Sequence, residues 1–196
     1  MYDAPSSPIL DTRAGLSVRP DVLWIPIAAR VEGAGSVEAV AALQGLASNI
    51  SSELASLHAG ATLQPGRLAL AAEATEKAST KGDSTQLEGR VVLPLDLDAD
   101  YWQRARLAAS AHELLREHAR VAAKATPRIQ LAWRTGTPRL VDADALYPVL
   151  AAVWKSRVAM LDDAAEHVGW NAPVQIEQTA VSLEEVKLTL VCTQQP

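Results

Sequence analysis

The stretch VLWIPIAARV, residues 22–31, decides the fold class because its apolar side chains alternate over a full strand length. A strand that is half-buried against a core requires one face made only of apolar residues. Here that face consists of Leu23, Ile25, Ile27, Ala29 and Val31. The sequence GAG at 33–35 breaks the strand, and Ser36 is a favourable N-cap for an amphipathic helix ending at Gly60. The chain therefore begins as a mixture of strand and helix.

The periodicity of the remaining sequence predicts the order β-α-β-β-α-β-α-β-β. The further elements expected are a hairpin of residues 68–74 and 87–97, a helix from Asp98 or Asp100 to Lys124, a strand at 129–133, a helix from Asp142 or Asp144 to Gly169, and strands at 174–176 and 186–192. Hairpins combined with β-α-β units predict an α+β fold with helices on one face of a mainly antiparallel sheet.

The bulk composition predicts one folded domain preceded by a short arm. The chain has 196 residues, of which 48% are hydrophobic and 21% charged, and these values are ordinary for a globular protein. Residues 1–14 combine proline with little periodicity, which favours a flexible or extended arm. We expect residues 15–196 to form a single α+β domain.

Charge and hydropathy argue against two kinds of partner. The net charge is -5 and the sequence lacks the basic stripe typical of nucleic-acid binders. No apolar run approaches the ~18 residues of a membrane span, and the first residues lack the basic and apolar regions of a secretory signal. A cytoplasmic location is expected, although a mature form whose signal has been removed also fits.

No group of residues has the spacing of a catalytic or metal site. The lone cysteine, Cys192, excludes a zinc site built from cysteines. His112 and His118 are six residues apart and point to different sides of a helix, while Asp163 and His167 share a face but form only a two-residue match. We therefore expect no catalytic residues, no metal and no cofactor.

The second face of the first strand suggests an interface. Val22, Trp24, Pro26 and Ala28 lie on it, and it turns polar only at Arg30. A one-sided sheet usually has a polar outer face, so this apolar face predicts contact with another copy of the chain. Cover by a loop or the N-terminal arm of the same chain is the alternative. Pro26 and Pro94 indicate edge strands, because proline removes a ladder hydrogen bond.

Arg157 is the other candidate interface residue. It lies between Val153 and Leu161, inside the apolar stripe of the third expected helix. One interpretation lets its aliphatic stem cover apolar surface while the guanidinium reaches water. The other has it pair with a carboxylate at an interface between subunits.

Three segments, taken in order, resemble the bacterial SIMPL domain family, the YggE-like proteins. They are the sequence PD at 20–21 with SVEA at 36–39, the strand at 91–98 that ends in acidic residues, and the helix end AAEHVG at 164–169 followed by VQIE at 174–177. The likeness covers about residues 15–193. It implies a protein without agreed catalytic residues, with envelope or stress roles and a tendency to assemble.

Two interpretations of function follow from these observations. The first is a non-enzymatic, self-assembling structural or interaction protein that forms homo-oligomers. The alternative is a small-molecule-binding domain with a cleft between its helices and its sheet. An enzyme is disfavoured because no nucleophile, acid or base converges in the pattern.

Overall fold

The computed structural model describes residues 15–70, 84–162 and 175–191, and it has an α+β fold with antiparallel strands, as predicted. In chain order the elements are β1 (Gly15–Val18), β2 (Val22–Glu32), α1 (Ser36–Leu57), β3 (Thr62–Ala69), β4 (Ser84–Pro94), α2 (Tyr101–Ala122), β5 (Ile129–Trp133), β6 (Thr137–Arg139), the 3-10 turn η1 (Asp144–Leu146), α3 (Tyr147–Asp162), β7 (Gln175–Ser182) and β8 (Glu185–Val191).

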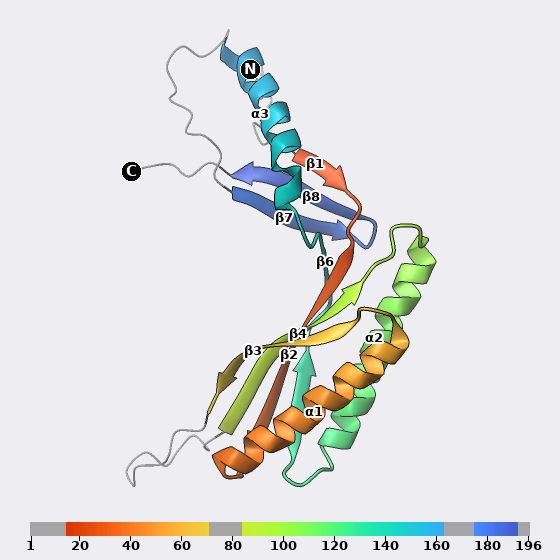
Figure 1. Ribbon diagram of the computed structural model, residues 1–196, viewed down its shortest axis with the longest axis vertical. Helices are drawn as coiled ribbons and strands as arrows, with labels where there is room; N and C mark the ends of the chain where they lie inside the picture. Colours follow the sequence, from red (N-terminus) through yellow and green to blue (C-terminus); the bar gives the residue numbers. More distant parts are fainter. Residues whose placement is uncertain (1–14, 71–83, 163–174, 192–196) are drawn as a thin grey trace, which may run out of the picture.

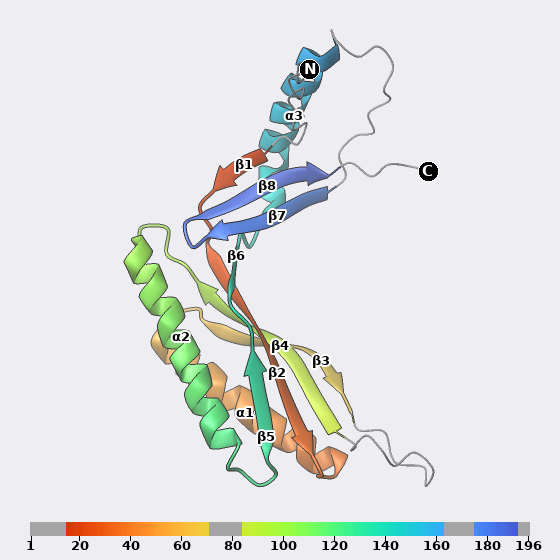
Figure 2. The same cartoon turned by 180° about the vertical axis from the view of Figure 1, so that it is seen from behind.

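The strands form two sheets rather than one (Figures 1 and 2). The larger sheet has the order β3-β4-β2-β5, and β6 pairs with β2 in line with β5. The run β2-α1-β3-β4-α2-β5 is the β-α-β-β-α-β arrangement of the ferredoxin-like fold. We call β2–β6 with α1 and α2 the large lobe.

The core of the large lobe lies between its sheet and the two helices. The five alternating residues of β2 predicted to face inward are all buried. They pack against the buried stripe of α1, which consists of Ala39, Leu43, Leu46, Ile50 and Leu54. Because both α1 and α2 contribute to this one core, the opposite face of the sheet has no helix from this pair on it.

The smaller sheet has the order β1-β8-β7, and α3 packs against β8. Val186, Leu188 and Leu190 alternate as predicted and are buried, together with Leu150 of α3. We call β1, β7, β8, η1 and α3 the small lobe. The short strands β1 and β6 had no signal in the sequence, because four and three residues are too few to show an alternation.

The two prolines predicted to mark edge strands lie in central strands instead. β2 is paired on both sides, with β4 and with β5 and β6, and β4 lies between β2 and β3. Pro26 is tolerated because it falls where β6 has ended and β5 has not begun. The Pro26 carbonyl accepts a hydrogen bond from the Arg134 backbone N–H, which lies just after β5. Because the N–H and C=O of one strand residue point to the same side, the N–H that proline lacks would have pointed into the gap between β6 and β5.

The buried stripe of α2 differs from the predicted one. Two polar residues, Arg104 and His118, are buried in it beside Ala111, Leu115 and Ala122. The spacing of the apolar residues predicts a stripe of Leu107, Ala111, Leu114 and Val121 for this helix, but Val121 is 56% exposed. A stripe inferred from apolar residues alone is rotated away from the true one, because it leaves out every buried polar side chain.

The boundaries of several elements also differ from the predictions. Gly35, and not Ser36, is the N-cap of α1, and no side-chain hydrogen bond caps that helix. The first arm of the hairpin runs from 62 to 69 instead of 68 to 74. The expected arm at 1–14 lies outside the described residues, as do Asp163, His167 and Cys192.

The start of α2 gives a direct test of helix capping. The Asp100 side chain accepts a hydrogen bond from the Gln103 backbone N–H at 2.7 Å, and the Gln103 side chain accepts one from the Asp100 N–H. Asp100→Ala is expected to lower the free energy of unfolding by about 1 kcal/mol, because the N-terminal N–H groups of the helix lose their acceptor. Urea denaturation of this variant beside Asp98→Ala, which removes the other acidic residue considered as a cap, measures the effect. Equal losses in both variants would contradict it.

Candidate functional site

The candidate site is the face of the larger sheet that α1 and α2 leave uncovered, here called the open face. The strand register brings Trp24, Pro26 and Ala28 onto it, as the sequence predicted for one side of β2. Their partners there come from both neighbouring strands, and include Arg90, Glu88, Val92, Ala132 and Thr137. The open face therefore combines an apolar strip along β2 with charged residues beside it.

Trp24 is half-buried, because two arginines cover its ring. The guanidinium carbon of Arg90 lies 3.9 Å from the ring centroid, and that of Arg139 lies 5.2 Å from it. Both distances are typical of cation–π contacts. The Arg90 Nε also donates to the Gln64 Oε1 at 3.0 Å, which fixes the guanidinium over the indole.

A hollow of about 440 Å³ opens beside Trp24 along β2. The strip contributes Pro26 and Ala28, and β5 contributes Ala132, all of which are short side chains. Glu88 and Arg134, which are long and charged, line the hollow as well. The depression exists because small residues meet at the centre of three strands while long ones project around them. Such a hollow can receive an apolar side chain from a partner.

The charges around the hollow have both signs. Arg90 and Arg134 are cationic, and Glu88 is anionic and exposed. Farther along β2, the Arg30 guanidinium forms an exposed ion pair with Glu32 at 3.1 Å. A face of mixed sign can pair with an identical face, whereas a face of one sign would repel its own copy.

Arg157 does not join the other three predicted interface residues. It lies on α3, and α3 packs against β8 of the small lobe. Its side chain is outside the described part of the chain. Both interpretations of Arg157 therefore remain predictions.

The arginines that cover Trp24 were not found from the sequence. Arg90 faces Trp24 diagonally from β4, and Arg139 comes from a three-residue strand. A cross-strand neighbour depends on register, and the register of distant strands is set by the whole sheet. Arg90 falls within the predicted hairpin arm at 87–97, but nothing in the sequence indicated which residue would lie opposite it.

The histidines of the described ranges take part in separate pairs. The His112 Nδ1 accepts a hydrogen bond from the Trp133 Nε1 at 2.9 Å. The His118 Nε2 lies 3.3 Å from the Glu53 carboxylate, and the His58 Nε2 lies 3.3 Å from the Asp96 carboxylate. Within residues 15–70, 84–162 and 175–191, no group of three or more His, Cys, Asp or Glu side chains could hold a metal ion.

Among the helices that the structure describes, none combines the length and the apolar content needed to cross a bilayer.

Comparison with known proteins gives structural likenesses only. No family model matches the chain, and no curated protein matches it. Among solved structures, the YXEP protein of Bacillus subtilis, described as a dinuclear metal binding peptidase from the M20 family, is similar at 16% identity and a TM-score of 0.36, over 69% of this chain and 34% of that one. A hydantoinase/carbamoylase family amidase from Burkholderia ambifaria is similar at 18% identity and a TM-score of 0.37, over 67% of this chain and 34% of that one. The chain spans about a third of the length of these proteins.

These comparisons correct the family expected from the sequence. The similar structures are peptidase and amidase family members and not SIMPL proteins, so the SIMPL resemblance is wrong. The prediction of a non-enzymatic structural protein, with its stress-related role, falls with it. At TM-scores of 0.36 and 0.37 the likenesses themselves assign no activity to this chain.

Proposed function

We propose that this chain associates with a second copy of itself through the open face of the large lobe. One observation carries the proposal: a hollow with an apolar floor, on the sheet face that α1 and α2 leave uncovered, is ringed by long side chains of both charges. Apolar surface rimmed by polar groups is typical of protein interfaces. A second copy is the occupant that fits the mixed charges best.

The charges on β4 support a two-fold arrangement. Glu88 and Arg90 are two residues apart, so both project from the open face of β4. A two-fold axis through the hollow would bring Arg90 of one copy toward Glu88 of the other, and the reverse contact would form at the same time. Arg90 is already held in place by Gln64 and Trp24, so ordering it at an interface costs little side-chain entropy.

The size of the face is also compatible with a stable dimer. β2 and β4 have eleven residues each, which corresponds to a length of about 36 Å at ~3.3 Å per residue. Four strands at a spacing of ~4.8 Å give a width of about 19 Å. Because β3, and β5 together with β6, are shorter than β2 and β4, the planar area is about 600 Å². A standard interface buries about 800 Å² per partner, which a pleated surface of this size approaches.

Association through the face is favoured over extension of the sheet at β3. The register of β3 with β4 shifts between Pro65 and Leu68, and such an irregularity twists an edge away from further pairing. Pro65 also lacks the N–H group that a new strand would use.

Ala132→Glu is expected to dissociate the dimer. Ala132 is exposed in the hollow, so the substitution leaves the core intact but places a charge at the centre of the interface. Sedimentation velocity of the full chain over 1–100 μM should show dimers of twice 20.9 kDa for the unchanged protein and at least a tenfold higher dissociation constant for the variant.

The matched control is Ala109→Glu, the same change at an exposed position of α2 on the helix side. It should dimerise like the unchanged protein. A monomer at 100 μM, or a dimer that Ala132→Glu leaves intact, would overturn the proposal.

A further inference from the structure

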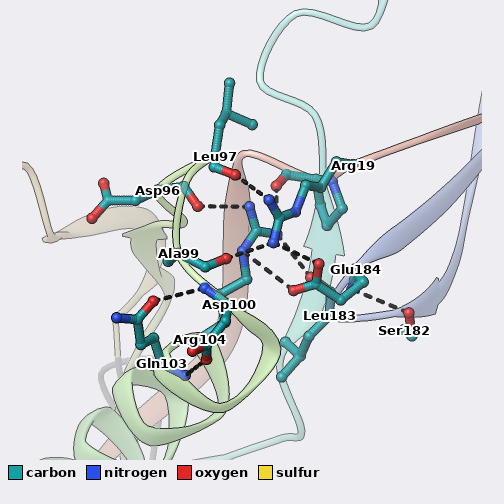
Figure 3. Close-up of polar contacts among 11 residues, drawn as sticks. Arg19, Asp96, Leu97, Ala99, Asp100, Gln103, Arg104, Ser182, Leu183 and Glu184 are labelled. Atoms are coloured by element: carbon teal, nitrogen blue, oxygen red, sulfur yellow. Dashed lines mark hydrogen bonds and ion pairs between the residues drawn. The ribbon is translucent and has the colours of Figure 1, made fainter.

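Three charged side chains meet where the two lobes touch, and the open face does not involve them. Arg104 comes from α2 of the large lobe, Glu184 from the turn between β7 and β8 of the small lobe, and Arg19 from the link between β1 and β2. Figure 3 shows both guanidinium groups directed toward the Glu184 carboxylate. The residues are distant in sequence, so only the packing of the lobes brings them together.

Arg104 is an anchor buried inside the large lobe. Its side chain is 0% exposed. It donates to the carbonyl oxygens of Pro20 at 3.0 Å and Asp96 at 2.7 Å, and across the lobe boundary to that of Leu183 at 2.9 Å. The fork of the guanidinium suits three acceptors in different directions. Arg104 thus connects α2, the start of β2 and the small-lobe hairpin.

Glu184 supplies the negative charge that this arrangement requires. Its carboxylate lies 2.6 Å from the Arg19 guanidinium and 3.5 Å from the Arg104 Nε. Arg19 also donates to the carbonyls of Leu97 and Ala99. Burial, and after it the charge of Arg19, lowers the pKa of Arg104, while Glu184 acts in the opposite direction. Two guanidinium groups therefore share one carboxylate.

The packing around the hairpin tip is incomplete. A hollow of about 390 Å³ lies between the lobes, lined by Leu23, Ala108 and His112 of the large lobe and by residues 180–183 of the hairpin. Leu183 is half-buried against the large core. A tip that rests on few apolar contacts depends on its polar ones to stay in place.

The chain crosses between the lobes at two short segments. One is Arg19–Asp21, and the other runs from Leu140 to Ala143. The second is tied to β7 by the Gln178 side chain, which accepts from the Leu140 N–H at 2.9 Å and donates to its carbonyl at 3.3 Å. Short paired crossings of this kind allow rotation of one lobe about the other without unfolding either.

We propose that the β7–β8 hairpin is a latch, in which Glu184 holds the small lobe closed on Arg104 and Arg19, and that loss of the Glu184 charge lets the lobes rotate apart at the two crossings. Without the carboxylate, two like charges remain side by side, one of them buried. Arg19 stays beside Arg104 through the Leu97 and Ala99 carbonyls, but separation of the hairpin from α2 lets water reach both guanidinium groups, which screens their repulsion and relieves the desolvation.

The experiment measures the distance between the lobes. Cysteines introduced at Ala109 on α2 and Glu177 on β7, both exposed, carry spin labels in a Cys192→Ser background, and the labelled chain is diluted with unlabelled protein. Pulsed electron–electron double resonance should give a narrow distribution of distances between the two labels for this background. For Glu184→Gln the distribution should broaden or shift to longer distances.

Two further variants make the result specific. Glu185→Gln is the matched control: Glu185 accepts from Ser17 within the small lobe at 2.7 Å, so its distribution should stay narrow. Adding Arg19→Met to Glu184→Gln removes the repulsion and should narrow the distribution again. An unchanged distribution in Glu184→Gln, with folding verified by circular dichroism, would overturn the latch, as would equal broadening in Glu185→Gln.

Discussion

Ile25→Ala is expected to lower the free energy of unfolding by about 2–5 kcal/mol, because it removes buried methyl groups and leaves a cavity in the large core. Ile25 is 0% exposed at the middle of β2, opposite Val91 on β4. The strand beside it, β4, is itself paired on both sides and cannot move into the space, so we expect a loss toward the upper end of that range. Urea denaturation followed by circular dichroism measures it.

The same experiment on Leu188→Ala should give a different pattern. Leu188 is also 0% exposed, but it belongs to the small lobe, whose buried cluster among the described side chains consists of Ala143, Leu150, Val186, Leu188 and Leu190. A core of this size has little stability of its own. Hydrogen exchange should therefore quicken in β7, β8 and α3 while β2 and β4 stay protected, whereas Ile25→Ala should quicken exchange in both lobes.

Val37→Ala is the control for both substitutions, because Val37 is 86% exposed on α1 and surface changes usually stay within about 0.5 kcal/mol. Uniform loss of protection across both lobes in Leu188→Ala would show that the small core supports the large one. That result would contradict the expectation that the small lobe depends on the large lobe but not the reverse. It would indicate that the two lobes unfold as one cooperative unit.

The sequence predicted the strands and helices in which a single hydrophobic periodicity continues over a long segment. The alternation in β2 and the stripe of α1 placed the core of the large lobe, and the fold class followed from the order of such segments. The sequence did not show that the sheet divides in two. That division depends on β1 pairing with β8 some 170 residues away (Gly15 with Thr189), and no local pattern encodes so distant a register.

The candidate residues were predictable only in part, for a related reason. The apolar outer face of β2 was visible as Trp24, Pro26 and Ala28, since alternate residues share a face. The arginines over Trp24 and the cluster of Arg19, Arg104 and Glu184 were not visible, because each joins elements far apart in the chain. Arg104 in particular interrupts no apolar run, so its burial has no signature in hydropathy.

Arg104→Ala is expected to destabilise the protein by about 3–5 kcal/mol, which is the usual cost of removing one partner from a buried charged network. The substitution removes the Arg104 donor from the carbonyls of Pro20 and Leu183. The Asp96 carbonyl loses its shorter hydrogen bond and keeps the one from the Ala99 N–H at 3.2 Å. The substitution also leaves a cavity under the start of α2. Thermal and urea denaturation measure the loss.

Two other substitutions of Arg104 separate the contributions of charge, hydrogen bonding and packing to this loss of stability. Arg104→Lys keeps the charge, but one ammonium cannot reach three carbonyls in a planar fork, so it should recover less than half of the loss. Arg104→Met fills the volume without donors. Its stability should remain close to that of Arg104→Ala, because the hydrogen bonds that Arg104 made to the three carbonyls are still missing. The control is Arg116→Ala on the same helix, whose exposed pair with Glu113 should contribute less than about 0.5 kcal/mol. If Arg104→Met were as stable as the unchanged protein, packing and not hydrogen bonding would be the reason this arginine is buried, and the hairpin would not be held through its carbonyl contact with Arg104.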